Sequence, residues 1–331
     1  MRALVYTGPY KVEFREEPDP VPGNDEVLVR VGAVGICGSD MHGYHGFDDR
    51  RPPPLVLGHE AAGVIVAGRG KGKRVTVNPL VTCGTCDYCH GGRQHLCRQR
   101  QILSLPPRGG AFAELVRVPE ANVVDIPDSL DISKASLAEP LAVGYHAVRL
   151  GATRIARPLS AVRCVVLGGG AIGLASALCL KLQGAEDIWV GEPHAGRRAT
   201  VERAGPFKVY APGSKGEPED SSADLVLDAV GAEATRVAAS RLVRAGGVIV
   251  HIGLLPGLAG LDVRKVTLQE VTFMGTYCYT MVEFRETVAA MITGRLGALD
   301  WYEERPLKDG AAAFDDIDNQ RTNAAKIILR P

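Results

Sequence analysis

Four of the eight cysteines in the chain lie within fifteen residues, in the stretch VTCGTCDYCHGGRQHLC. They are Cys83, Cys86, Cys89 and Cys97, in the pattern C-x2-C-x2-C-x7-C. Such a cluster could form disulfides, a redox site or a metal site. The first residues, MRALVYTGPYKVEF, alternate like a β-strand and show no signal peptide or targeting helix. We therefore expect a cytoplasmic protein, and in that reducing compartment clustered thiolates favour a metal over disulfides.

A second set of metal-binding residue types is spread over the segments GICGSDMHGYHG, LGHEAAG and LAEPLAVG. These segments supply a soft thiolate from Cys37, an imidazole from His59 and a carboxylate from Glu60 or Glu139. Together such donors suit a zinc ion that keeps one coordination position open. Taken singly, Cys37 could be a small buried residue and His59 an ordinary core histidine. Glu60 is harder to explain without a metal, because a carboxylate in apolar surroundings needs a partner.

A dinucleotide-binding pattern lies further along the chain. Gly168, Gly170 and Gly173 spell G-x-G-x-x-G, with Ile172 inside it, between an apolar strand-like stretch and a helix-like one. In that context the glycines permit a tight turn, close approach of a pyrophosphate and packing of helix on strand. The amino end of the helix adds backbone amides and a positive dipole for the phosphates.

The same pattern requires an acidic residue about 20 positions later, at the end of the next strand. Glu192, in DIWVGEP, occupies that place. A carboxylate can accept hydrogen bonds from both ribose hydroxyls of NAD and repels the additional phosphate of NADP. The sequence therefore predicts NAD as the cofactor. Arg197 and Arg198 follow closely and could instead receive that phosphate, although on a helix they could equally be solvated or stacked on adenine.

The elements that must position these residues change character along the chain. Roughly the first 140 residues are short strand-like pieces between glycine and proline turns, which predicts a β-rich unit. From Arg163 onward strand-like and helix-like stretches alternate, which predicts a doubly wound parallel sheet. Val230, Ile252 and Gly253 follow later strands of that sheet and should lie near the ribose and nicotinamide. The strand-like NAAKIILRP has no evident partner there and should return to the β-rich unit.

The charge and the hydrophobic runs of the chain argue against two classes of binding partner, nucleic acid and membrane. Lys plus Arg number 38 and Asp plus Glu number 38, so the chain lacks the basic surplus of a nucleic-acid-binding protein. Its longest uncharged run, residues 164–180, contains GGGAIG and fits a strand, turn and helix better than a membrane span. We therefore expect a small-molecule partner, with neither nucleic acid nor membrane.

The segments CGSDMH, GHEAAG, the four-cysteine lobe and the glycine-rich turn resemble those of zinc-dependent medium-chain dehydrogenases, and the resemblance covers essentially the whole chain. The sorbitol (polyol) dehydrogenase branch is most similar, because EPLAVGYHA carries a glutamate, Glu139, where classical alcohol dehydrogenases place a cysteine. The fold implied is α/β: a Rossmann doubly wound parallel sheet plus a β-rich GroES-like catalytic domain.

The resemblance implies two zinc ions per chain. A catalytic zinc would be held by Cys37, His59 and a glutamate, either Glu60 or Glu139, with Asp40 orienting His59. A structural zinc would be held by the four clustered cysteines in a lobe at about residues 80–100. His90 and His95 lie inside this lobe and could substitute, but the all-cysteine set is complete.

The activity implied is reversible hydride transfer between a secondary alcohol or polyol and NAD, with zinc as the Lewis acid. Ser39 would accept the alcohol proton and pass it through a ribose hydroxyl to His42, while Tyr44, His45 and Phe47 would line the substrate pocket. Threonine, butanediol, sugar-acid and sugar-phosphate dehydrogenases share these motifs. No dense Arg or Lys cluster occurs at 41–57, which mildly disfavours a phosphorylated substrate. A non-catalytic NAD-binding protein and a zinc-free quinone reductase are the alternatives of other kinds.

For the organisation of the chain we expect residues 1–141 and 281–331 to form the catalytic domain and residues 142–280 the Rossmann domain. The segment VTFMGTYCYT is apolar and comes last in the parallel sheet. An exposed edge of this kind invites pairing with a second copy. A homodimer or homotetramer is therefore predicted.

Overall fold

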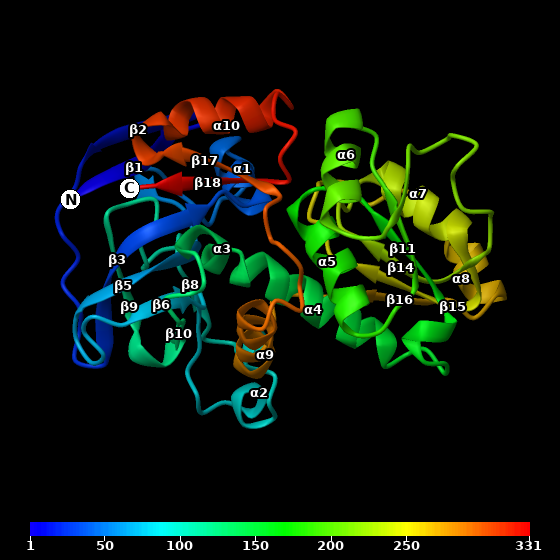
Figure 1. Cartoon of the computed structure of the whole chain (residues 1–331), viewed down its shortest axis with the longest axis horizontal. Coiled ribbons are helices and arrows are strands. Elements are labelled where there is room, and N and C mark those ends of the chain that lie inside the picture. Colours follow the sequence, from blue (N-terminus) through cyan, green and yellow to red (C-terminus); the bar gives the residue numbers. More distant parts are fainter.

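The computed structural model describes all residues, 1–331, and its strands form four sheets, two of them large. Figure 1 shows the β-rich part, which contains both termini, at the left and the parallel sheet with its helices at the right. Helix α4 (Ala138–Ala152) runs through the middle of the molecule, where the two parts meet.

The parallel sheet has six strands in the order β13-β12-β11-β14-β15-β16, and every neighbouring pair is parallel. This is the order of a doubly wound dinucleotide-binding fold. Strand β14 is buried along its whole length because helices cover both faces of such a sheet. The strands are β11 (Arg163–Leu167), β12 (Asp187–Gly191), β13 (Lys208–Tyr210), β14 (Ala223–Asp228), β15 (Val243–His251) and β16 (Thr272–Gly275), and the helices between them are α5 (Ala171–Leu182), α6 (Ala195–Ala204), α7 (Glu233–Leu242) and α8 (Val263–Leu268).

The β-rich part is built on a seven-stranded sheet in the order β10-β6-β5-β3-β18-β17, with β9 also paired to β3. Two smaller sheets, β2-β1-β4 and β7-β8, complete it. Its strands from the first half of the chain are β1 (Arg2–Gly8), β2 (Lys11–Glu16), β3 (Glu26–Gly35), β4 (Leu55–Val56), β5 (Glu60–Ala67), β6 (Arg74–Val77), β7 (Leu80–Val81), β8 (Gln101–Ile102), β9 (Leu115–Pro119) and β10 (Val123–Asp125), and its short helices are α1 (Gly38–Tyr44), α2 (Asp87–His90) and α3 (Ile132–Ser136).

The end of the chain returns to this sheet. Strand β18 (Lys326–Arg330) pairs antiparallel with β3, with Ile328 opposite Gly35, which confirms the expected return. Two further elements were not predicted from the sequence: β17 (Tyr302–Pro306), parallel to β18, and helix α10 (Gly310–Asp318). Figure 1 shows β17, β18 and α10 beside the amino-terminal strands.

The division of the chain into domains at residues 141 and 281 stays a prediction. Helix α4 crosses the first of these positions, and one buried cluster of 38 residues joins α4, the parallel sheet and helix α9 (Met281–Ile292). A second cluster of 24 buried residues lies within the β-rich part. None of the helices is both long and apolar enough to cross a membrane.

Candidate active site and metal centres

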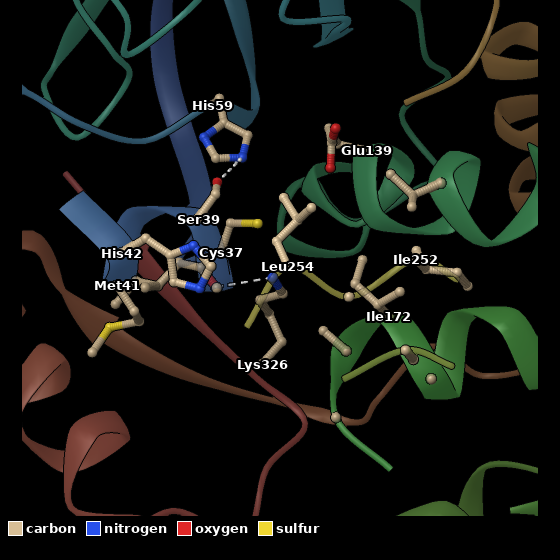
Figure 2. A pocket seen from close by; sticks show the side chains of 18 of the residues that line it. Cys37, Ser39, Met41, His42, His59, Glu139, Ile172, Ile252, Leu254 and Lys326 are labelled. Atoms are coloured by element: carbon tan, nitrogen blue, oxygen red, sulfur yellow. Dashed lines mark hydrogen bonds between the residues drawn. The ribbon is translucent and has the colours of Figure 1, made fainter. Parts of the chain in front are cut away.

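A cavity with a volume of about 690 Å³ is lined by residues from both parts of the molecule. The β-rich part contributes Cys37, Ser39, His42 and His59, and the parallel sheet contributes the glycine-rich turn and Glu192. Figure 2 shows the sulfur of Cys37, the imidazole of His59 and the carboxylate of Glu139 facing the same space from different elements. The two sets of predicted residues therefore meet in one cavity.

Cys37, His59 and Glu60 form the first candidate metal set, and their donor atoms lie within 4.8 Å of one another. Cys37 is the residue before helix α1, and Glu60 is the first residue of β5. Gly58 has a φ of +90°, which lets the chain turn sharply just before His59. The antiparallel pairing of Gly35 with Glu60 then places the end of β3 beside the start of β5.

Asp40 fixes the positions of Cys37 and His59 through its buried carboxylate. It is fully buried, and its carboxylate accepts hydrogen bonds from the backbone N–H groups of Cys37, at 3.0 Å, and Gly58, at 3.2 Å. The same carboxylate lies 3.4 Å from Nδ1 of His59. Burial acts to lower the pKa of His59, but the charges of Asp40 and Cys37 outweigh it and hold that pKa well above its ordinary value. Asp40 therefore occupies the position expected of a residue that orients His59, leaving Nε2 toward the cavity.

Glu60 has a partner that the sequence analysis missed. Its Oε1 accepts a hydrogen bond of 2.7 Å from Nζ of Lys326, on β18, and both side chains are buried. Lys326 also donates to the backbone carbonyl of Ile36, at 2.9 Å. The other oxygen of Glu60, Oε2, is buried without a partner. A side chain at residue 35 would collide with that oxygen, so Gly35 makes room for it.

Glu139 lies in the first turn of α4 and lines the same cavity. Its Oε1 accepts a hydrogen bond of 3.0 Å from the hydroxyl of Tyr279. Burial raises the pKa of Glu139 to about 7; the charge of His59 opposes this shift and the charge of Glu60 adds to it. Its carboxylate is outside the 4.8 Å group of Cys37, His59 and Glu60.

The residues at this site fit a zinc ion. Sulfur, imidazole nitrogen and carboxylate oxygen are the donors of an open zinc site. Here Cys37 and His59 line the cavity, Glu60 lies buried within 4.8 Å of them, and Glu139 lines the same cavity. The unpartnered Oε2 of Glu60 and the buried carboxylate of Glu139 are both groups that a cation would stabilise.

The four clustered cysteines form the second candidate metal set. Their sulfur atoms lie within 4.8 Å of one another, with closest pairs at 3.5, 3.6 and 3.9 Å. A tetrahedron with Zn–S bonds of about 2.3 Å has edges of about 3.8 Å, so the spacing fits zinc. His95 is not part of this set: its ring packs on that of His146 at 4.7 Å, and its Nδ1 is buried without a partner.

The nucleotide side of the cavity is built as the glycine pattern predicts. Gly168 has a φ of +99°, and a side chain at Gly173 would collide with the carbonyl oxygen of Gly168. Gly170 immediately precedes helix α5 and has open space where a side chain would stand. Ile172, Val230, Ile252 and Gly253 all line the cavity.

Glu192 lies at the end of β12 and is buried, with its side chain in the cavity wall. Its carboxylate accepts hydrogen bonds of 2.8 Å from the backbone N–H groups of Gly169 and His194. Arg197 lies beside it, with Nε donating to Oε1 at 3.2 Å. Arg198 turns away and donates to backbone carbonyls of Glu192 and Pro193.

Ser39 and His42 both lie on helix α1 and line the cavity (Figure 2). The hydroxyl of Ser39 is 3.5 Å from Nε2 of His59. Burial, helped by the positive charge of Arg51, lowers the pKa of His42. Ser104, which the sequence analysis missed, is buried with its hydroxyl 3.4 Å from Nδ1 of His59.

The prediction that Tyr44, His45 and Phe47 line the pocket was wrong. None of them belongs to the cavity wall. Tyr44 is buried against Phe314, and Nε2 of His45 lies 2.6 Å from Asp318 of α10. Phe47 is 70% exposed. Tyr44 and His45 instead contact helix α10, which the sequence analysis had not predicted.

Comparison with known proteins shows which protein family this chain resembles. Residues 23–128 match the alcohol dehydrogenase GroES-like domain, and residues 171–293 match the zinc-binding dehydrogenase domain. Sorbitol dehydrogenase of Bacillus subtilis (strain 168) is 34% identical over 84% of this chain and 82% of its own length. L-galactonate-5-dehydrogenase of Escherichia coli (strain K12) is 31% identical over 90% and 89%. A zinc-binding dehydrogenase from Sinorhizobium meliloti 1021, solved with NADP bound, is 29% identical with a TM-score of 0.87 and covers 100% of this chain and 99% of that one.

The fold, the cavity between its two parts and the two metal-binding sets define a zinc-dependent oxidoreductase. With the two domain matches and these relatives, the chain belongs to the zinc-dependent medium-chain dehydrogenase/reductase family, in the branch that contains the sorbitol (polyol) dehydrogenases.

Proposed function

We propose that this enzyme transfers a hydride reversibly between a secondary alcohol of a polyol-like substrate and NAD. The observation that carries the proposal is the single cavity whose wall contains Cys37, His59 and Glu139 together with the glycine-rich turn and Glu192, with Glu60 buried next to Cys37 and His59. A non-catalytic NAD-binding protein would not need such a metal set, and a zinc-free quinone reductase would lack both metal sets.

The proposed roles in the reaction follow from the positions of the side chains. Zinc, when held by Cys37, His59 and a glutamate, supplies Lewis acidity, which lowers the pKa of an alcohol hydroxyl. Of the two glutamates we favour Glu60 in the donor set, because its carboxylate lies with Cys37 and His59. Ser39 is proposed to take the proton of the alcohol, and His42 to release it to solvent. A lowered pKa keeps His42 neutral and able to accept that proton.

Glu192 and its hydrogen bonds support NAD as the cofactor. The carboxylate is fixed by two backbone N–H groups at the end of β12, where the ribose of a bound dinucleotide would lie. The relative from Sinorhizobium meliloti was solved with NADP, so Arg197 matters for the choice. In this chain Arg197 already pairs with Glu192.

The test is a panel of polyols and secondary alcohols offered with NAD, followed by the absorbance of NADH and accompanied by metal analysis. We expect turnover of at least one alcohol class and two zinc ions per chain. The panel should include neutral polyols and sugar acids, because two relatives are named for sorbitol and for L-galactonate. It should also include threonine, butanediol and sugar phosphates. A purified protein with no zinc, or with zinc and no alcohol oxidation, would contradict the proposal.

We further propose a cytoplasmic homodimer, either alone or doubled to a tetramer. Strand β16 is the outer strand of the parallel sheet, with Phe273 37% exposed. Three further large apolar side chains, Leu258, Val263 and Leu268, are exposed in the residues leading to it. A partner copy paired along β16 would cover part of this surface.

A further inference from the structure

Residues 254–260, LLPGLAG, form a segment between strand β15 and helix α8, which we call the leucine segment. Its first two residues, Leu254 and Leu255, line the cavity, and Figure 2 shows Leu254 among the side chains of the wall. None of its backbone groups makes a hydrogen bond to another backbone group. All three of its leucines are exposed rather than packed into a core. The segment therefore has little of its own to keep it in the cavity wall.

The side chain of Arg236, on helix α7, makes the hydrogen bonds that hold this segment. Its Nε donates to the carbonyl oxygen of Ala259 at 2.5 Å, and its Nη2 donates to that of Gly257 at 3.0 Å. The remaining nitrogen, Nη1, donates at 2.6 Å to the carbonyl oxygen of Gly231, in the loop after β14. Gly231 directly follows Val230, which lines the cavity. One guanidinium group thus joins the leucine segment to a second loop of the cavity wall.

The choice of arginine at this position indicates a role in placing these loops. Arg236 is only 6% exposed, and its hydrogen bonds go to backbone carbonyls and to no carboxylate. A buried guanidinium without a counter-charge is costly to desolvate, so these hydrogen bonds must offset that cost. Arginine presents its donors in a planar fork, which lets one side chain reach three carbonyls in different directions. An apolar side chain would fill the same space without the desolvation cost but would hold none of them.

Other contacts fix the two ends of the leucine segment. The N–H of Gly253, just before it, donates to the last carbonyl of β14 at 3.0 Å. The N–H of Asp262, just after it, donates at 3.0 Å to the hydroxyl of Ser240, one helical turn beyond Arg236 on α7. Gly260 lets the chain approach the same helix, because a β-carbon there would lie 2.4 Å from a carbonyl oxygen of α7. The middle of the segment is held by Arg236.

We propose that Arg236 is a positioning residue for the cofactor: it holds the leucine segment so that Leu254 and Leu255 stay in the cavity wall and retain bound NADH. The inference rests on the proposed function, because it takes NAD as the cofactor. The segment follows the carboxyl end of β15, where a doubly wound sheet binds its dinucleotide. Without Arg236 no hydrogen bond would hold the middle of the segment, and its movement away from the cavity would open a path for the cofactor to leave.

The experiment measures the dissociation rate of NADH by stopped-flow fluorescence, together with KM for NAD and kcat. Arg236→Gln should speed dissociation at least about tenfold, because it removes charge-assisted hydrogen bonds. KM for NAD should rise, and kcat should fall by a smaller factor than KM rises. Arg236→Lys, which keeps the charge without the planar fork, should recover only part of the loss. An unchanged dissociation rate in Arg236→Gln would overturn the proposal.

Arg244→Gln is the matched control for a general loss of stability. Arg244 lies at the other end of β15, away from the cavity, and its Nε is 2.7 Å from the buried carboxylate of Asp224. This variant should lower the melting temperature and leave the dissociation rate of NADH unchanged. If it sped dissociation as much as Arg236→Gln does, the effect of Arg236 would be one of stability alone, and the proposal would fail.

A double variant tests whether Arg236 acts through the leucine segment. Leu254→Ala removes part of the cavity wall and should by itself speed the dissociation of NADH. Combining it with Arg236→Gln should add little, because both changes remove the same contact with the cofactor. Fully multiplicative effects on the rate would show that Arg236 does not act through Leu254 and would contradict the proposal.

Two further outcomes separate this inference from the proposed function. If Arg236→Gln does not fold, Gly260→Ala tests the same placement, because its β-carbon would push the segment away from α7. It should also speed NADH dissociation, and an unchanged rate would overturn the inference. If NADH binds but no alcohol is oxidised, the proposed function fails while the dissociation rates still test Arg236. A protein that does not bind NADH would overturn both.

Discussion

At the scale of single residues, Lys326 explains how a carboxylate can be buried next to a metal set. Glu60 is fully buried, and a lone carboxylate in such a place would be strongly disfavoured. The ammonium of Lys326 takes one of its oxygens and leaves the other, Oε2, free. Lys326 therefore stabilises Glu60 as an anion while leaving it able to serve as a donor. The buried carboxylate of this candidate metal set thus depends on a residue 266 positions away in the sequence.

The preference for NAD over NADP is a prediction that concerns single residues. A 2′-phosphate next to the carboxylate of Glu192 costs at least about 1–2 kcal/mol even with partial screening. We therefore expect a preference for NAD of at least about tenfold in kcat/KM, measured with both cofactors at saturating substrate. Glu192→Ala should raise the use of NADP, because Arg197 then loses its partner and can bind the phosphate.

The double variant Glu192→Ala with Arg197→Ala is the control for this mechanism and should lose the gain. Arg198→Ala is a second control, because Arg198 already donates to two backbone carbonyls. Equal use of NADP and NAD by the unmodified enzyme would mean that Glu192 does not reach the ribose.

At the scale of elements, the two metal sets should differ in what they support. Cys37 lies at the start of α1 in the cavity wall, whereas Cys89 lies on α2 in a separate lobe. Cys37→Ala or His59→Ala should abolish turnover and leave NAD binding largely intact, as followed by fluorescence titration. Cys89→Ala should instead lower the melting temperature or disturb assembly. Each variant should retain one zinc ion per chain, and wild-type activity in Cys37→Ala would refute the catalytic assignment.

The contact between α4 and α9 gives a prediction about pH. Burial acts to raise the pKa of Glu283, but hydrogen bonds from His146 and from Thr280 at the start of α9 lower it to about 2. A carboxyl with a depressed pKa stabilises the fold above its unfolded pKa, near 4.5, and this contribution is lost as the pH falls toward 2.

Glu283→Gln should therefore lower the free energy of unfolding by about 1–3 kcal/mol. Urea unfolding should show a difference between the two proteins at pH 5 that shrinks as the pH falls below about 4.5. Glu286→Gln, on the same helix, serves as the comparison. A difference that grew as the pH fell from 5 toward 2 would contradict this account.

Assembly belongs to the scale of the whole molecule. We expect light scattering at micromolar concentration to give a dimer or tetramer, because β16 leaves an apolar edge unpaired. Phe273→Lys should shift the protein toward the monomer. Phe14→Lys is a matched control, since Phe14 on β2 is also 37% exposed, and it should leave the mass unchanged. A monomeric unmodified protein would refute the prediction.

Much of this molecule could be predicted because its signals are short-range. The parallel sheet is encoded by alternating strand and helix patterns, the four-cysteine set and the nucleotide turn are compact motifs, and the residues of the other metal set lie in three short segments. Lys326, Tyr279 and Ser104 could not be predicted, because each acts through a contact between distant segments. The error about Tyr44 and His45 has the same origin, since both contact α10, a helix from the distant end of the chain.

The return of β18 to β3 has a consequence for how the protein is made. A ribosome completes the six strands of the parallel sheet by residue 275, and helix α9, which packs in the same buried cluster, follows at residues 281–292. The sheet that contains Glu60, next to Cys37, is completed last. Its strand β18 and the ammonium group that pairs with Glu60 are synthesised only from residue 326 onward. During that interval the nascent chain exposes one edge of β3 and an unneutralised carboxylate, so an early stop codon would leave a nucleotide-binding half attached to a β-rich half that cannot close.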